Sequence, residues 1–190
     1  MSKTALLMID MQNGFLNPAS SLYIPGSEKT IPACAALIRR CHEQKVPVFF
    51  VTREYRPDGS DVEKARYEKW LKGGKPLSFG CDPEISTEMP EEFETDPEED
   101  YLIIKPRYSA FFSTELDVIL RRIGVERVLI AGTTTPNCIR STCYDALSLN
   151  YDVVVFRDCT SAATEEIQES NLRDMENVGA EIVLLSDFIW

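Results

Sequence analysis

Short runs of apolar residues recur along the chain without the polar alternation that marks a strand with one wet face. Parallel strands covered on both faces have this character, because neither face meets water. Val, Ile, Leu and Phe make up most of each run, as expected for strands. We therefore predict strands at Ala5–Ile9, Val46–Thr52, Tyr101–Ile104, Arg127–Ala131, Val153–Phe156 and Glu181–Leu185.

Between most of these runs, apolar residues fall three and four positions apart, which is the period of an amphipathic helix. Thr164 is a suitable N-cap for the last of these segments, because its hydroxyl can accept a hydrogen bond from a free N–H group of the first turn. The predicted helices lie near Thr30–Lys45, at Leu116–Ile123, at Pro136–Leu149 and from Thr164 to about Gly179.

Strand and helix alternate along the chain, which indicates right-handed crossovers and a parallel sheet between two helical layers. We expect an α/β fold: a three-layer α/β/α sandwich around a six-stranded parallel sheet, with Rossmann-like topology. Residues 1–190 are read as a single domain. A long irregular excursion at about residues 53–100 is expected to be a lid or an oligomer contact, and its acidic run Glu91–Asp100 a solvated surface.

Composition narrows the classes of partner. The chain has 190 residues, 27% of them charged, and a formal net charge of −11, which disfavours nucleic acids and anionic membranes as partners. No apolar stretch approaches the ~18 residues of a membrane span, so we expect a cytoplasmic protein. The six cysteines are then expected to be thiols. With no Cys-x-x-Cys pair and a single histidine, neither a metal site nor a cofactor is predicted.

Chemically active side chains follow several of the predicted strands. In open α/β sheets, ligands bind at the carboxyl ends of the strands. Asp10 follows the first strand, Arg53 and Glu54 the second, Lys105 the third, and the segment 132–138 the fourth. An acid, a base and a thiol are therefore expected to meet at one edge of the sheet.

Cys138 lies at the mouth of a predicted helix. With Thr135 as N-cap and Pro136 in the first turn, Cys138 falls at about the third helical position. There the helix dipole favours a thiolate, which lowers the thiol pKa and makes the sulfur a candidate nucleophile. The alternative is a small buried hydrophobe, which suits the cysteines on apolar helix stripes better.

A cysteine nucleophile needs a base, and His42 lies in the middle of an early helix. Asp10 is the remaining candidate, because burial at a strand end raises a carboxyl pKa toward a useful value. Lys105 can hold both anions and stabilise developing charge. The alternative for Asp10 and Lys105 is a structural ion pair.

These residues stand in three motifs, at 7–15, 105–111 and 132–142. In all three the chain resembles the isochorismatase-like cysteine hydrolases, and the resemblance covers nearly its whole length. It implies a catalytic triad of Asp10, Lys105 and Cys138. It also implies a non-prolyl cis peptide between Thr133 and Thr134, an oxyanion hole formed by the N–H groups of Thr134 and Cys138, and a homo-oligomer of two or more subunits.

The loop Arg53–Ser60 departs from one branch of the family. Nicotinamidases carry an aspartate and two histidines there as metal ligands, and this loop has no histidine. Isochorismatases proper do not use the cysteine. The chain is therefore most similar to the metal-free branch, which includes N-carbamoylsarcosine amidase and ureidoacrylate and biuret-type hydrolases. The resemblance implies hydrolysis of a small amide, carbamoyl or ureido substrate through a cysteine thioester, releasing ammonia or an amine.

Other functions stay open. A nicotinamidase- or isochorismatase-type activity is one alternative, and a catalytically silent member that only binds a small molecule is another. Receiver-type phosphotransfer needs a second carboxylate for Mg²⁺, but Met11 and Gln12 follow Asp10. A nucleotide-binding module is disfavoured because no G-x-G-x-x-G follows a strand.

Several polar and aromatic residues are candidates for binding the substrate. The predicted set is Gln12, Phe15, Arg53, Trp70 and Tyr108. Arg56 and Arg107 are further candidates for pairing with a substrate carboxylate. For Trp70 and the arginines, a purely structural role is the alternative. Cys159, placed in the loop after the fifth strand, is expected to line the rim of the site or to pack.

Overall fold

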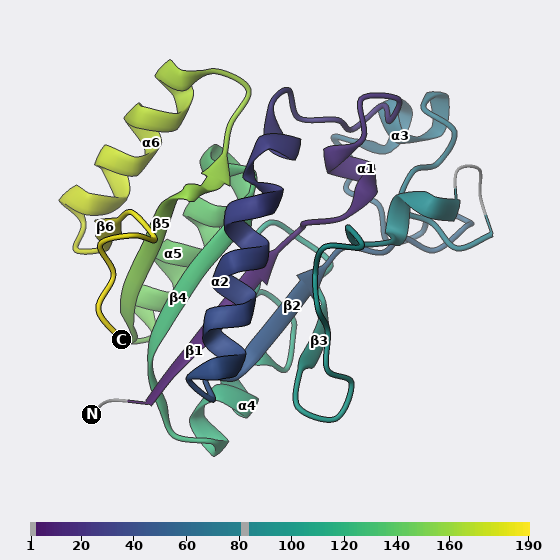
Figure 1. Cartoon of the computed structure of the whole chain (residues 1–190). Coiled ribbons are helices and arrows are strands. Elements are labelled where there is room, and N and C mark those ends of the chain that lie inside the picture. The colour runs from purple at the N-terminus through teal and green to yellow at the C-terminus, as the bar shows by residue number, and fades with distance from the viewer. Residues whose placement is uncertain (1–2, 81–83) are drawn as a thin grey trace.

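Six parallel strands form one sheet in the computed structural model, which describes residues 3–80 and 84–190 (Figure 1). They are β1 (Lys3–Ile9), β2 (Val48–Thr52), β3 (Tyr101–Ile104), β4 (Val125–Thr133), β5 (Asp152–Ser161) and β6 (Glu181–Val183). Their order across the sheet is β3-β2-β1-β4-β5-β6. Each pairing is parallel, so all the strands end at the same edge. The predicted six-stranded parallel sheet is confirmed.

Helices cover both faces of this sheet (Figure 1). Leu6 and Met8 of β1 pack in one hydrophobic cluster with α2 (Ile31–Glu43) and the C-terminal segment. Ala5, Leu7 and Ile9, which alternate with them, pack on the other side. The cluster on that side includes residues of α4 (Leu116–Arg122), α5 (Arg140–Ser148) and α6 (Glu165–Asn177). Because successive strand residues face opposite ways, one apolar strand supplies both cores, and the three-layer prediction is confirmed. Among the described residues, no helix is long and apolar enough to cross a bilayer.

The predicted excursion at about 53–100 folds against the segment after β1, with residues 81–83 outside the described residues. It contains α3 (Tyr67–Lys72) and the 3-10 turn η2 (Glu84–Thr87), while α1 (Asn13–Leu16) and the turn η1 (Ser27–Thr30) follow β1. A third hydrophobic cluster, formed by Phe15, Tyr55, Val62, Trp70 and Leu77, joins α1 to the excursion. The excursion and α1 therefore share a small core beside the carboxyl edge of the sheet.

β1, β2 and β4 differ from their predicted ranges by two residues at one or both ends, and the differences at β5 and β6 have identifiable causes or consequences. β5 continues past Phe156 through a register shift against β4, and this places Cys159 inside the strand, fully buried, and not in a loop. β6 stops at Val183 rather than Leu185, because the Leu185 N–H donates to the side-chain carboxylate of Asp158 in β5 (3.0 Å) and not to a main-chain carbonyl of that strand. A strand end that is set by a side-chain acceptor cannot be predicted from the periodicity of apolar residues.

The opening of the helix that carries Cys138 also differs. A π-helical turn, η3 (Thr135–Ile139), precedes α5, and its N-cap is Thr134, one residue earlier than predicted. Pro136 still lies in the first turn, where its missing N–H costs nothing.

Gly132 lets β4 approach β1 closely at the carboxyl edge. Its φ is +117°, and a Cβ at this position would overlap the backbone of Ile9. We predict that Gly132→Ala lowers the free energy of unfolding by more than about 4 kcal/mol or prevents folding, measured by urea titration. Gly179→Ala is a matched control, because Gly179 has a φ of +112° with nothing within 4 Å. It should cost only about 1 kcal/mol. Equal losses in both variants would contradict the role of the close approach.

Candidate active site

Asp10, Lys105 and Cys138 meet at the carboxyl edge of the sheet, as the sequence predicted. They follow β1, β3 and β4, and they are 1%, 0% and 5% exposed. The Lys105 ammonium donates to Asp10 Oδ2 over 2.7 Å and lies 3.5 Å from the Cys138 sulfur. It also donates to the Arg107 carbonyl (3.2 Å). One cation therefore contacts both the carboxylate and the thiol.

The backbone of Asp10 turns sharply where β1 ends. Its φ is +52°, in the left-handed region that few residues other than glycine, asparagine and aspartate adopt. Its N–H donates to Val51 O of β2 (2.8 Å), so the turn stays tied to the sheet. The second carboxylate oxygen, Oδ1, is buried and has no hydrogen-bond donor. It is available to accept a proton.

Cys138 lies in the π-helical turn just after a cis peptide bond between Thr133 and Thr134, the position that the family resemblance implies. The Thr134 carbonyl accepts from the N–H groups of Asn137 (3.0 Å) and Ile139 (3.3 Å). The next hydroxyl, that of Thr135, lies 2.6 Å from Gln168 Oε1. These bonds fix the backbone on both sides of the sulfur.

A buried polar network behind this turn was not foreseen from the sequence. Gln168 of α6 also donates to the Thr160 hydroxyl (2.9 Å), and Ser161 of the extended β5 contacts Thr133 (3.0 Å). A glutamine on the inward face of an amphipathic helix is the signal that could have revealed it, because buried amides need partners.

The pKa of the Cys138 thiol is raised, where the helix position had suggested that it would be lowered. Burial raises it most, and the negative charge of Asp10 raises it further. Lys105 and Arg53 act in the opposite direction without reversing the shift. The resting thiol is therefore protonated at neutral pH, and a nucleophilic sulfur requires a base to remove the proton.

Arg53 lies beside these groups and is fully buried. Its Nη1 contacts the Tyr55 hydroxyl (2.9 Å) and the Glu63 carboxylate, and Tyr55 donates to the same carboxylate (2.7 Å). Burial disfavours the charged guanidinium, but nearby negative charge, that of Asp10 first, keeps the pKa of Arg53 above its ordinary value. Glu63 and Tyr55 were not predicted, since nothing in the pattern of an irregular segment points to such contacts.

The other predicted substrate-binding residues have different surroundings. Gln12 uses its amide to hold the backbone of Arg53 (3.1 and 2.8 Å) and of Thr87 (3.0 Å). Phe15 and Trp70 pack in the third hydrophobic cluster, and Trp70 donates to Pro76 O (3.0 Å). The side chains of Gln12, Phe15 and Trp70 therefore make their contacts within the protein.

Tyr108 and the two remaining arginine candidates lie further out. Tyr108 is 37% exposed, and the Arg53 guanidinium lies 5.6 Å from the centre of its ring. Arg56 extends into solvent beside Asp58, and Arg107 donates to the Asp61 carbonyl (3.0 Å). Of the predicted binding set, Arg53 and Tyr108 are thus the members grouped beside the triad.

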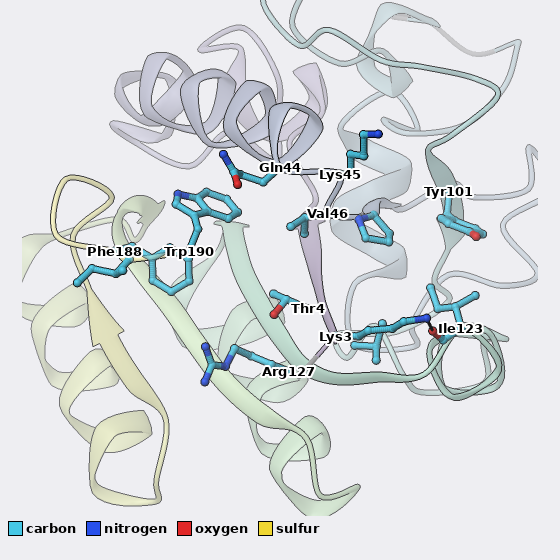
Figure 2. A pocket seen from close by; sticks show the side chains of 13 residues that line it. Lys3, Thr4, Gln44, Lys45, Val46, Tyr101, Ile123, Arg127, Phe188 and Trp190 are labelled. Carbon is cyan, nitrogen blue, oxygen red and sulfur yellow. Dashed lines mark hydrogen bonds between the residues drawn. The ribbon is translucent and has the colours of Figure 1, made fainter. Parts of the chain in front are cut away.

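A cavity of about 830 Å³ lies at the opposite edge of the sheet (Figure 2). Lys3, Tyr101 and Val125, which begin β1, β3 and β4, line it together with the C-terminal Trp190. None of the predicted site residues contributes to its lining. Because ligands of open parallel sheets bind at the carboxyl ends of the strands, the position of the triad, and not cavity size, defines the candidate site. Within residues 3–80 and 84–190, no group of three His, Cys, Asp or Glu side chains is placed to hold a metal ion.

The chain belongs to the isochorismatase family: the model of the isochorismatase domain matches residues 4–187. A probable inactive nicotinamidase of Arabidopsis thaliana is 38% identical over 97% of this chain and 94% of its own length. An isochorismatase family protein of Desulfovibrio vulgaris has a similar structure, with a TM-score of 0.92 and 39% identity over 98% of this chain and 96% of that one. N-carbamoylsarcosine amidase of Thermoplasma acidophilum superposes with a TM-score of 0.77 at 28% identity, covering 98% of each chain.

Replacing Asp10 with asparagine should lower the pKa of the Cys138 thiol, because the change removes a negative charge that raises it and leaves Lys105 and Arg53 in place. The measurement is the pH dependence of Cys138 alkylation by iodoacetamide, followed by mass spectrometry of the peptide that contains it. Asp58→Asn, at an exposed carboxylate, is the control. An unchanged or higher thiol pKa in Asp10→Asn would show that Asp10 does not act on the sulfur.

Proposed function

We propose that the protein hydrolyses a C–N bond in a small amide, carbamoyl or ureido compound, with Cys138 as the nucleophile. The observation that carries the proposal is the contact of one buried ammonium, Lys105 Nζ, with both Asp10 and Cys138, beside a carboxylate oxygen that has no donor. The structural similarity of this chain to an N-carbamoylsarcosine amidase supports the same chemistry.

In the first half of the reaction, Asp10 Oδ1 takes the thiol proton and the Cys138 sulfur attacks the substrate carbonyl carbon. The carbonyl oxygen gains the electron pair and becomes an oxyanion, which the backbone N–H groups of Thr134 and Cys138 receive. Asp10 then gives its proton to the leaving nitrogen. The C–N bond breaks, ammonia or an amine departs, and a thioester remains on Cys138.

In the second half, the Asp10 carboxylate removes a proton from a water molecule, and the resulting hydroxide attacks the thioester carbon. The tetrahedral intermediate collapses with the Cys138 sulfur as leaving group. The sulfur recovers a proton from Asp10, and the acid product is released. The Lys105 ammonium contacts both groups and offsets the negative charge that moves between the carboxylate and the sulfur.

A binding-only function is the second candidate, because a relative of 38% identity is named a probable inactive nicotinamidase. That name concerns nicotinamide, and the loop Arg53–Ser60 of this chain has none of the histidines that serve nicotinamidases as metal ligands. Hydrolysis and binding without reaction are distinguished by measuring turnover of the wild type and of a variant that lacks the Cys138 thiol.

We expect Cys138→Ala to abolish release of ammonia or amine from a panel of small amides, carbamoyl and ureido compounds, a loss of at least about 10³-fold in kcat/KM. Cys143→Ala, five residues along and buried in the core, is the matched control: it should lower stability and keep turnover. Wild-type protein should also acquire the mass of an acyl group on the peptide that contains Cys138. Full activity in Cys138→Ala would refute the proposed nucleophile. Binding without turnover by the wild type would favour the second candidate.

A further inference from the structure

The π-helical turn that carries Cys138 is held by buried polar groups from outside its own helix. Thr135, the first residue of this turn, is completely buried, and its hydroxyl lies 2.6 Å from Gln168 Oε1 and 3.0 Å from the Ser161 carbonyl. Gln168 belongs to α6 and Ser161 to the end of β5. The turn is therefore tied to two elements that contribute no group of the triad.

The amide of Gln168 has one orientation that satisfies both of its ends. Its Nε2 lies 2.9 Å from the hydroxyl and 3.4 Å from the carbonyl of Thr160. Because a carbonyl can only accept, the NH2 group faces Thr160, and Oε1 accepts from the Thr135 hydroxyl. Gln168 is 6% exposed, so neither end can exchange its partner for water unless the structure opens. The side chain therefore links β5 to the turn in a fixed geometry.

A second series of hydroxyl groups reaches the residue just before the turn. The Ser161 hydroxyl lies 3.0 Å from that of Thr133, which lies 3.3 Å from that of Thr134. The pairing of β5 with β4 resumes beyond a register shift, which places Thr160 beside Gly132 and Ser161 beside Thr133. The irregular end of β5 thus supports both the residues before the turn and the glutamine that holds its first residue.

We propose that Gln168 is a positioning residue for the hydrolysis: it holds the turn so that the Cys138 sulfur keeps its place beside Lys105. The inference rests on the proposed function. The sulfur lies 3.5 Å from Lys105 Nζ, and a displacement of about 1 Å at a reacting group can cost about 100-fold in rate. Gln168 reaches the sulfur only through Thr135, so it acts on the position of the nucleophile and not on its chemistry.

Stability alone does not require an amide at this position. An apolar side chain of the same length would fill the space, and the Thr135 hydroxyl would keep the Ser161 carbonyl as its acceptor. An apolar side chain cannot supply the second acceptor that fixes the direction of this hydroxyl, or the donor to Thr160. Gln168→Met removes these hydrogen bonds and leaves the shape of the side chain almost unchanged.

The test compares Gln168→Met with Asn171→Leu in the same helix. Asn171 is also buried, and its amide bonds to the Arg140 guanidinium (2.9 Å), two residues after Cys138, and to the Ile167 carbonyl (2.8 Å). The two variants are therefore matched in burial and in lost hydrogen bonds. The measurements are the Tm, the kcat and KM for release of ammonia or amine from small amides, carbamoyl and ureido compounds, and the rate of Cys138 alkylation by iodoacetamide.

We expect both variants to lower the Tm by a similar amount, roughly 3–10 °C. Gln168→Met alone should lower kcat by at least about 10-fold while KM changes by less than about 3-fold. It should also speed alkylation of Cys138 at neutral pH, because a looser turn exposes a sulfur that is now only 5% exposed. Asn171→Leu should keep the wild-type kcat and rate of alkylation.

Gln168→Glu provides a rescue that depends on pH. A protonated carboxyl matches the amide in shape and can donate to Thr160, whereas a carboxylate would place a negative charge against the Thr160 carbonyl. Burial disfavours the carboxylate and raises the pKa of the introduced carboxyl. The kcat of Gln168→Glu, divided by that of the wild type at the same pH, should therefore be close to unity at low pH and fall as the pH rises through that pKa.

The outcomes separate the positioning role from the proposed function. Equal losses of kcat in Gln168→Met and Asn171→Leu, with no change in alkylation, overturn the positioning role and leave the hydrolase proposal standing. Turnover that survives Cys138→Ala overturns the proposed function itself. If the wild type releases no ammonia or amine, alkylation decides: a faster rate in Gln168→Met alone supports the link to the sulfur, and the same rate in both variants overturns it.

Discussion

A buried ion pair organises the carboxyl edge of this sheet. Lys105 and Asp10 are almost completely removed from water, and the desolvation of either charge alone would cost several kcal/mol. Their 2.7 Å contact offsets that cost and joins the ends of β3 and β1, which β2 separates in the sheet. Because the same ammonium reaches the Cys138 sulfur, the pair also fixes where the thiol lies relative to the carboxylate.

Strand order explains why these groups can meet. The sheet is built outward from β1 and β4, which are neighbours although long stretches of chain separate them. The chain reverses its direction of winding between these two strands, and open α/β sheets bind their ligands at such switch points. Asp10 follows one of the two strands and Cys138 follows the other. Gly132 allows the two strands to pack close enough for a single lysine to bridge them.

Local signals made much of this predictable from the sequence. Apolar runs indicate the six strands. Asp10, Lys105 and Cys138 could be recognised as candidates because each follows one of these strands. The surroundings of Arg53 could not be predicted, because Glu63 reaches it from an irregular segment with no periodicity. The raised pKa of the Cys138 thiol could not be predicted either. It results from burial and from the charge of Asp10, and neither effect can be judged before the tertiary structure is known.

The net charge of −11 does not determine the electrostatic character of the candidate site. Surface charges are screened over about 8 Å at physiological ionic strength, whereas contacts inside a dry site are screened far less. The charges of Asp10, Lys105 and Arg53 therefore act most strongly on a bound ligand. In the proposed reaction, hydrolysis of an amide leaves a new carboxylate beside the buried charge of Asp10. Repulsion between these like charges raises the free energy of the bound product relative to the substrate. The carboxylate that we propose as the base therefore also favours release of the product in the proposed reaction.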